Sequence, residues 1–237
     1  MIYTKGGSKD KSNFLQTATV EQIQGHTNLV RQGLDPCILP PCPRCGVTPN
    51  FFKRHEKRRR IFYIIVELIV TKVLGLLSRW KCPGCNKTAT SYPGFALPYK
   101  RFTLPTIQSL SLSYVENPFA SYRKLLAECP LVYEIPPESD SNREPTMEHS
   151  TIHRWISTMG SYGHLVQTAT DLIIQADPAT RLYRDLAGLN ISPGKYRSLS
   201  RKQTLLTCFH LVFLMPIYRA IFQIGIFPKL ATLSDYT

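Results

Sequence analysis

The chain has 237 residues and a net charge of +13, with 29 lysines and arginines against 16 acidic residues. Its apolar fraction of 43% is ordinary for a globular protein and excludes a wholly disordered chain. Most of the excess charge falls in residues 37–102, which hold thirteen basic residues and two acidic ones. A focused positive field attracts polyanions such as nucleic acid. An acidic protein or an anionic membrane would be attracted too, so charge alone does not identify the partner.

Residues 1–36 are mixed and polar, and we interpret them as an N-terminal extension with a short helix around residues 19–34. The first residues lack the apolar segment of a secretory signal. We therefore expect a reducing, cytoplasmic and nucleoid-associated setting. In such a setting, close cysteine pairs bind metal rather than form disulfides.

Residues 37–103 are predicted to form a β-rich domain. The run 61–77 is dense in β-branched residues, and alternation places Phe62 and Ile64 on one face of a strand. Gly75 is expected to bend the chain between two strands. Because the run also contains Glu67 and Lys72, a buried strand pair fits it better than a membrane span.

Two matched motifs, CPRCG and CPGCN, place Cys42, Cys45, Cys82 and Cys85 in C-P-x-C turns. Two residues between thiolates let a tight turn aim both sulfurs at one point, and the following Gly46 or Asn86 tolerates a positive φ. Two such turns supply four sulfurs in a tetrahedron, which suits one structural zinc ion and leaves no open position for catalysis.

Three other interpretations of these cysteines remain open: an iron–sulfur cluster, exposed disulfides, and unrelated thiols. Cys37 lies five residues before Cys42 and is a candidate replacement ligand, although it has no paired turn of its own. A free or partly buried thiol is the simpler interpretation for Cys37.

Basic side chains around the cysteine turns are candidate phosphate contacts, since lysine and arginine supply most contacts to the nucleic-acid backbone. Aromatic residues among them (Phe51, Phe52, Tyr63 and Trp80) are candidate base-stacking groups, although a place in the core is the simpler interpretation for aromatics on strands. The candidate DNA-binding residues of this region are Arg44, Lys53, Arg54, Lys57, Arg58, Arg59, Arg60, Arg79, Lys81, Lys87, Lys100 and Arg101.

From residue 104 the pattern becomes helical. Helices are predicted at 104–114, 121–129, 147–159, 163–176 and 202–225, and the proline-rich, acidic stretch 130–146 is predicted to be an exposed loop. The last helix is interrupted by polar groups and by Pro216, so we expect a buried helix, kinked at that proline, rather than a membrane span.

The stretch 147–160 has the pattern of the second helix of a helix-turn-helix. Ile152, Trp155 and Ile156 form an apolar stripe, which leaves His153 and Arg154 facing outward as candidate DNA-reading residues. The preceding helix candidate at 121–129 is separated by seventeen residues, where three or four are usual. An ordinary amphipathic helix is the alternative interpretation.

Residues 40–102 resemble a family of zinc-ribbon proteins carried by bacterial insertion sequences and other transposons. The motif CPRCG, the basic stretch after it and the run RWKCPGCNKTATSYPGFALPYKRFT (79–103) carry the resemblance. In such proteins a helix-turn-helix with an S-T-I-x-R-W pattern often follows, which matches residues 150–155. The resemblance implies DNA binding in transposition and covers about half of the chain.

We expect no catalytic activity. Transposases commonly need three carboxylates that hold two divalent metals, and the close set Asp171, Asp177 and Asp185 has the pattern of helix caps and surface charges. The predicted fold class is α+β, with a β-rich zinc ribbon (37–103), a helix-turn-helix-like region (104–160) and a C-terminal helical region (161–237).

The leading functional hypothesis is a non-catalytic DNA-binding protein of a mobile element, acting as an accessory, end-recognition or regulatory factor. The expected partners are DNA, a transposase and a second copy of the chain, without a membrane. An adaptor that docks a transposase through the ribbon is the main alternative, and a nuclease or transposase with a concealed site is a third.

Overall fold

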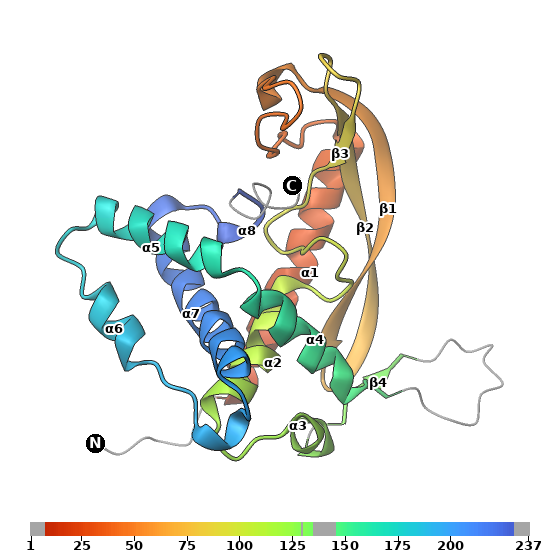
Figure 1. Cartoon of the computed structure of the whole chain (residues 1–237). Helices are drawn as coiled ribbons and strands as arrows, with labels where there is room; N and C mark the ends of the chain where they lie inside the picture. Colours follow the sequence, from red (N-terminus) through yellow and green to blue (C-terminus); the bar gives the residue numbers. More distant parts are fainter. Residues whose placement is uncertain (1–7, 129, 135–145, 230–237) are drawn as a thin grey trace.

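Figure 1 presents the protein as a computed structural model, which describes residues 8–128, 130–134 and 146–229. The fold is mixed α/β, with an antiparallel sheet in the N-terminal half followed by helices. The elements in chain order are α1 (Ser8–Gln32), η1 (Pro49–Phe51), β1 (Lys53–Val66), β2 (Ile69–Lys81), β3 (Thr88–Thr90), α2 (Leu104–Glu116), α3 (Tyr122–Glu128), β4 (Val132–Tyr133), α4 (His149–Gly160), α5 (Gly163–Ala176), α6 (Leu182–Gly188), η2 (Pro193–Lys195), α7 (Leu199–Phe222) and α8 (Ile226–Lys229).

The sheet is built on one long hairpin of β1 and β2, paired from Lys53–Lys81 to Val66–Ile69 with a shift of register between Arg54 and Glu56. Glu67 and Leu68 form its turn, both with positive φ, as a two-residue turn that follows the twist of the strands requires. The sequence-based placement of a bend at Gly75 is therefore wrong. Gly75 lies inside β2, where a Cβ atom would come within 2.8 Å of the fully buried ring of Phe62.

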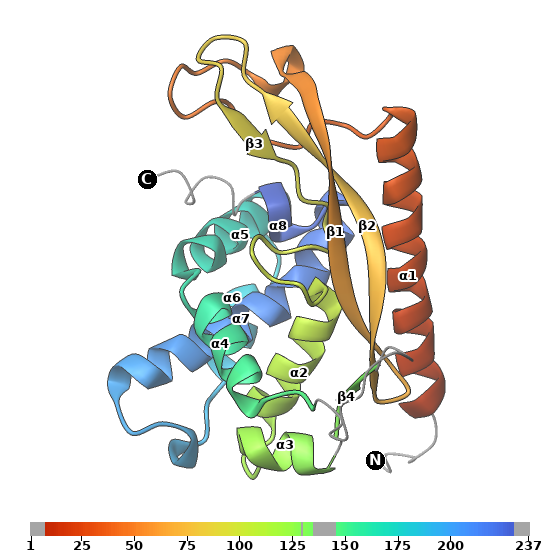
Figure 2. The ribbon, with the colours of Figure 1, turned by 90° about the vertical axis from the view of Figure 1, so that its right-hand side faces the viewer.

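Helix α1 runs alongside the hairpin, as Figure 2 shows. It begins before the helix expected at 19–34, and its Ile23 is fully buried with Phe62, Ile64 and Phe95. Helix α1 also packs closely against Gly75. A Cβ atom at this position would lie 3.2 Å from Ile23 Cγ2. Helix α1 thus covers one face of the hairpin.

The helices after residue 103 share one continuous hydrophobic core. Leu104 and Ile152, from the range 104–160, are buried in the same cluster as Ile173 and Leu205, from the range 161–237. The cluster does not break at Gly160, whose Cα faces the backbone of α7 so closely that a Cβ would meet Thr204 O at 2.3 Å.

Among the described residues, α7 is the one helix whose length and composition would allow it to cross a membrane. Its residues Leu205, Cys208, Leu211 and Leu214 are fully buried within the protein, and it packs against α2, α4 and α5. This agrees with the expected buried helix. Pro216 lies within α7 and does not end it.

The turn end of the hairpin joins the helical core. Residues 101–103 pair with Tyr63 at the outer edge of β1, and the Phe102 ring packs edge-on against Trp155 of α4 at 4.8 Å between centroids. On the other side, β4 adds to β2 in parallel, at a position where the sequence suggested only loop. The rest of the predicted acidic loop, residues 135–145, lies outside the described residues.

Candidate metal centre and its cationic surroundings

The two C-P-x-C segments form near-identical turns at the end of the hairpin opposite to β4 (Figure 1). In the first, the amide of Gly46 donates to Cys42 O at 2.8 Å, and in the second the amide of Asn86 donates to Cys82 O at 2.9 Å. Gly46 has a φ of +70° and Asn86 a φ of +60°. The positive φ expected from the sequence at both positions is confirmed.

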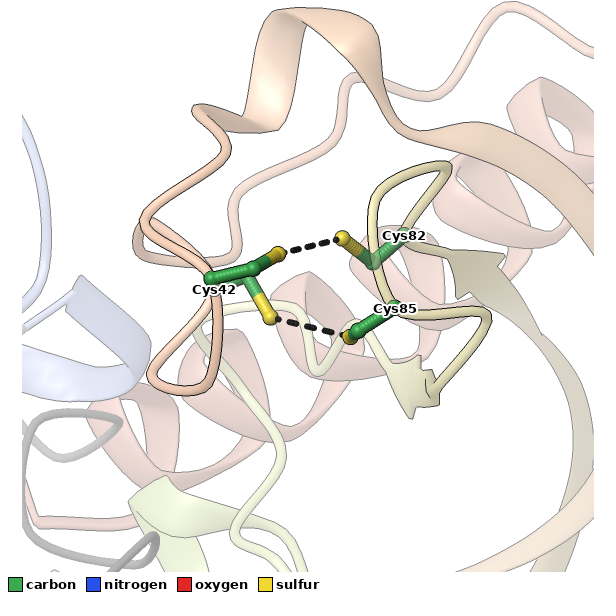
Figure 3. A group of neighbouring side chains, drawn as sticks. Cys42, Cys82 and Cys85 are labelled. Carbon is green, nitrogen blue, oxygen red and sulfur yellow. Dashed lines mark hydrogen bonds between the residues drawn. The ribbon is translucent and has the colours of Figure 1, made fainter.

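The turns bring the sulfurs of Cys42, Cys45, Cys82 and Cys85 within 4.8 Å of one another, and we call these residues the four-cysteine cluster. The Sγ atoms of Cys42 and Cys85 are 3.5 Å apart (Figure 3), and those of Cys45 and Cys82 are 3.4 Å apart. A disulfide bond would need about 2.05 Å. Four sulfurs about 2.3 Å from one tetrahedral ion would be about 3.8 Å apart, so the cluster fits a single metal ion.

Local electrostatics act differently on the four thiols: backbone N–H groups favour the thiolate of Cys42, whereas the neighbouring sulfurs and burial raise the pKa of Cys45 and Cys85 despite backbone N–H groups that lower it. The backbone N–H of Arg44, with that of Cys45, points at the Cys42 sulfur and lowers the pKa of this thiol to about 6. In the second turn, a Cβ atom at Gly84 would lie 2.9 Å from Val47 Cγ2 and 3.0 Å from Cys45 Sγ. Glycine at this position therefore lets the two turns approach closely enough to share one ion.

Cys37 is not a member of the cluster. It is a half-buried free thiol, and burial raises its pKa. The simpler of the two sequence-based interpretations of Cys37 therefore agrees with its position. Among the described residues, the four-cysteine cluster is the group of three or more histidine, cysteine or carboxylate side chains that could hold a metal ion.

The strand that leads away from the first turn carries the basic tract, with Lys57, Arg58 and Arg59 exposed on β1. The acidic residue of this stretch, Glu56, lies 3.4 Å from Arg58 and 3.6 Å from Arg79, in an exposed ion pair that adds little stability. Of the residues expected to contact DNA, those that are exposed are Arg44, Lys53, Lys57, Arg58, Arg59, Lys87, Arg101, His153 and Arg154, while Arg54, Arg60, Arg79, Lys81 and Lys100 are half-buried.

Two of the half-buried arginines have internal partners. Arg54 forms an ion pair with the buried carboxylate of Asp35, donates to Ser78 Oγ at 2.9 Å, and lies over the Trp80 ring at 4.6 Å. Arg60 donates to the carbonyl oxygens of Leu97 and Lys100. These contacts direct both guanidinium groups into the protein, which makes Arg54 and Arg60 poorer candidates for phosphate contact than the exposed cations of β1.

Two of the four aromatic residues singled out from the sequence agree with the core interpretation, which was the simpler one. Trp80 is buried, and Tyr63 packs against Phe102 and Tyr133, so both belong to the core. Tyr92 and Tyr99 were not singled out from the sequence, yet both line a groove beside the arginines of β1. The sequence shows that both tyrosines lie in the segment after the second cysteine turn. It does not show that this segment folds back against β1, so their position beside the arginines could not be predicted.

Helix α4 has its apolar residues inward, with Ile152, Trp155 and Ile156 buried. His153 and Arg154 are exposed, and the His153 ring meets Tyr122 of α3 edge-on at 5.6 Å between centroids. Burial, with Arg154 nearby, lowers the pKa of Lys100. Arg154 of α4 and Lys100 therefore lie close together.

The three carboxylates considered for catalysis lie on exposed parts of the helices. Asp171 accepts a hydrogen bond from Gln167 within α5, Asp177 accepts one from the amide of Ala179 after that helix, and Asp185 lies in the first turn of α6. These are local contacts within single helices and turns.

No protein-family model matches the chain, and comparison with curated proteins and with solved structures finds no match.

Proposed function

We propose that the protein is a non-catalytic DNA-binding protein whose four-cysteine cluster holds one structural zinc ion, as in a zinc ribbon. Zinc favours closed sites of four thiolates with sulfurs at tetrahedral spacing. Because thiolate binding by zinc is coupled to folding, the ion would fix the two turns and the paired ends of β1 and β2. Its role would be structural, since four protein ligands leave no position for water.

The observation that carries the DNA-binding assignment is the row of exposed cations on β1, the strand that follows the first cysteine turn in the chain. Arg58 and Arg59 are adjacent on an edge strand, and Glu56 is the acidic side chain paired with this row. A rigid strand keeps such cations at fixed spacing, so phosphates can be bound without ordering a flexible segment. The resemblance to transposon-borne zinc ribbons supports a role in a mobile element, as an accessory, end-recognition or regulatory factor.

Helix α4 is a second candidate DNA contact within the same proposal. Its exposed His153 and Arg154 lie opposite the buried stripe, as a groove-reading helix requires, and α3 packs beside it. The proximity of Arg154 to Lys100 would let the helix and the β1 cations bind one length of duplex.

The test is a double charge reversal, Arg58→Glu with Arg59→Glu, measured by equilibrium binding to duplex DNA over a series of salt concentrations. If both arginines contact phosphates, affinity falls and the slope of log K against log salt becomes shallower by about 1.8, at roughly 0.9 per contact. The matched control reverses Arg181 and Arg184, which are exposed on and beside α6 and change the net charge equally.

An equal effect of the two double variants would mean that only the overall charge matters and would contradict a β1 site. A wild-type protein that binds no DNA at low salt, yet forms a salt-resistant complex with a protein partner, would favour the adaptor hypothesis instead.

A further inference from the structure

A groove of about 530 Å³ lies beside the basic half of β1. Four arginines (Arg58, Arg59, Arg60 and Arg101) and two tyrosines (Tyr92 and Tyr99) line it, together with a few apolar residues. None of its described lining residues is acidic. The volume is within the range of roughly 300–1,000 Å³ that is typical of sites for small organic groups. The groove thus combines a cationic wall with aromatic faces.

Tyr99 combines an exposed side chain with an uncommon backbone conformation. Its side chain is 91% exposed, and its φ of +60° is a left-handed conformation that a bulky residue seldom adopts. Strained backbone of this kind persists where the surrounding structure holds it, and it is concentrated at functional sites.

Arg60 holds the loop that carries Tyr99. Its guanidinium donates to Leu97 O at 3.2 Å and to Lys100 O, the carbonyls on either side of Tyr99. The same guanidinium lies 5.2 Å from the centroid of the half-buried Tyr92 ring. Arg60 is therefore a positioning residue, because it fixes the loop and one tyrosine while the ring of Tyr99 stays open to solvent.

We infer that this groove binds single-stranded DNA, with a base stacked on Tyr99 and the adjoining phosphates contacted by Arg58, Arg59 and Arg101. Proteins that hold single strands combine a cationic groove with exposed aromatic rings on which bases stack. In a duplex, both faces of each base are already stacked on neighbours, so an exposed ring gains a partner only from an unpaired base. This inference rests on the proposed DNA-binding function and adds the strandedness of the ligand.

The test uses the zinc-loaded, full-length protein and two labelled probes, an oligothymidine of about 20 nucleotides and a mixed-sequence duplex of the same length. Binding is measured by fluorescence anisotropy at one salt concentration for the wild type, Tyr99→Ala and Tyr99→Phe. Tyr183→Ala is the matched control, because Tyr183 is also exposed, at 64%, and lies on α6. Because Tyr99 is exposed, its truncation removes no core contact, and far-UV circular dichroism checks the fold of each variant.

We expect Tyr99→Ala to weaken oligothymidine binding by about 5- to 100-fold, as loss of one stacked base does. Tyr99→Phe, which keeps the ring, and Tyr183→Ala should stay within two-fold of the wild type, and the duplex affinity of Tyr99→Ala should hardly change. Equal losses on both probes, or no loss on oligothymidine, would overturn the inference. A wild type that binds only the duplex would overturn it while leaving the proposed function intact, and binding to neither probe would refute both.

Discussion

The ion pair between Asp35 and Arg54 joins the segment after α1 to the start of β1, and its removal gives a sharp test of how the hairpin is held. The Asp35 side chain is 1% exposed and that of Arg54 is 25% exposed. Arg54 also donates to Ser78 Oγ at 2.9 Å and to the carbonyl oxygens of Gly33 and Asp35 at 3.0 Å. The substitution Asp35→Asn keeps the size of the side chain and leaves the arginine without its counter-ion.

The expected cost follows from burial and from the contacts that remain. Removing one partner of a buried ion pair costs about 3–5 kcal/mol when the other charge is left uncompensated. Because Arg54 keeps three acceptors and reaches solvent, we expect a smaller loss of about 2–3 kcal/mol in the free energy of unfolding. For a chain of this size, 1 kcal/mol corresponds to about 2–4 °C, so Tm should fall by about 4–12 °C.

The measurement is urea and thermal unfolding of the protein in buffer that contains one equivalent of added zinc, followed by far-UV circular dichroism. Asp171→Asn is the matched control, because it makes the same chemical change at an exposed carboxylate on α5. If Asp35→Asn lowered the free energy of unfolding by less than about 1 kcal/mol, and by no more than the control, the ion pair would contribute only as much as an exposed one. Such a small loss would refute the inference that the buried ion pair stabilises the start of the hairpin.

Two further predictions concern the metal and the pH. Cys82→Ser should lose the bound metal and the order of the hairpin end, whereas Cys37→Ser should keep about one equivalent, as measured by elemental analysis; equal metal content in the two variants would exclude the proposed ligand set. Burial lowers the pKa of His26 below its ordinary value of 6.5. As the pH falls below 6.5, the histidine is therefore protonated in the unfolded chain before it is protonated in the folded protein. Protonation then favours unfolding, and the free energy of unfolding decreases. His26→Gln should therefore lose less Tm than the wild type between pH 6.5 and about 5, and parallel pH profiles would contradict this.

The features that the sequence predicts well depend on residues that are close together in the chain. The two C-P-x-C turns followed from residue spacing, and the positive φ at Gly46 and Asn86 followed from the side chains that tolerate it. The helix at 163–176 was predicted with its observed bounds, since it begins at a glycine after a turn and ends before Asp177-Pro178. Local spacing was enough in each case.

The features that the sequence missed depend on contacts between distant residues. Gly75 was interpreted as a bend because a glycine in a strand is ambiguous, and only the approach of Phe62 and Ile23 shows that close packing requires it. The partner of Arg54 lies nineteen residues earlier, outside the basic tract. The loop that presents Tyr99 is likewise fixed by Arg60, which is about 40 positions away in the chain. The hydrophobic periodicity of the sequence does not predict which distant residues contact each other.

The length of the hairpin places the two tryptophans of the chain in different surroundings. At about 3.3 Å per residue, the fourteen residues of β1 span about 45 Å between the cysteine turns and the helical core. Trp80 is buried near the cysteine turns beneath Arg54, and Trp155 is buried in the helical core against Phe102. Single-tryptophan versions of the protein would thus carry one optical reporter at each end, and chelation should change the emission of Trp80 before that of Trp155.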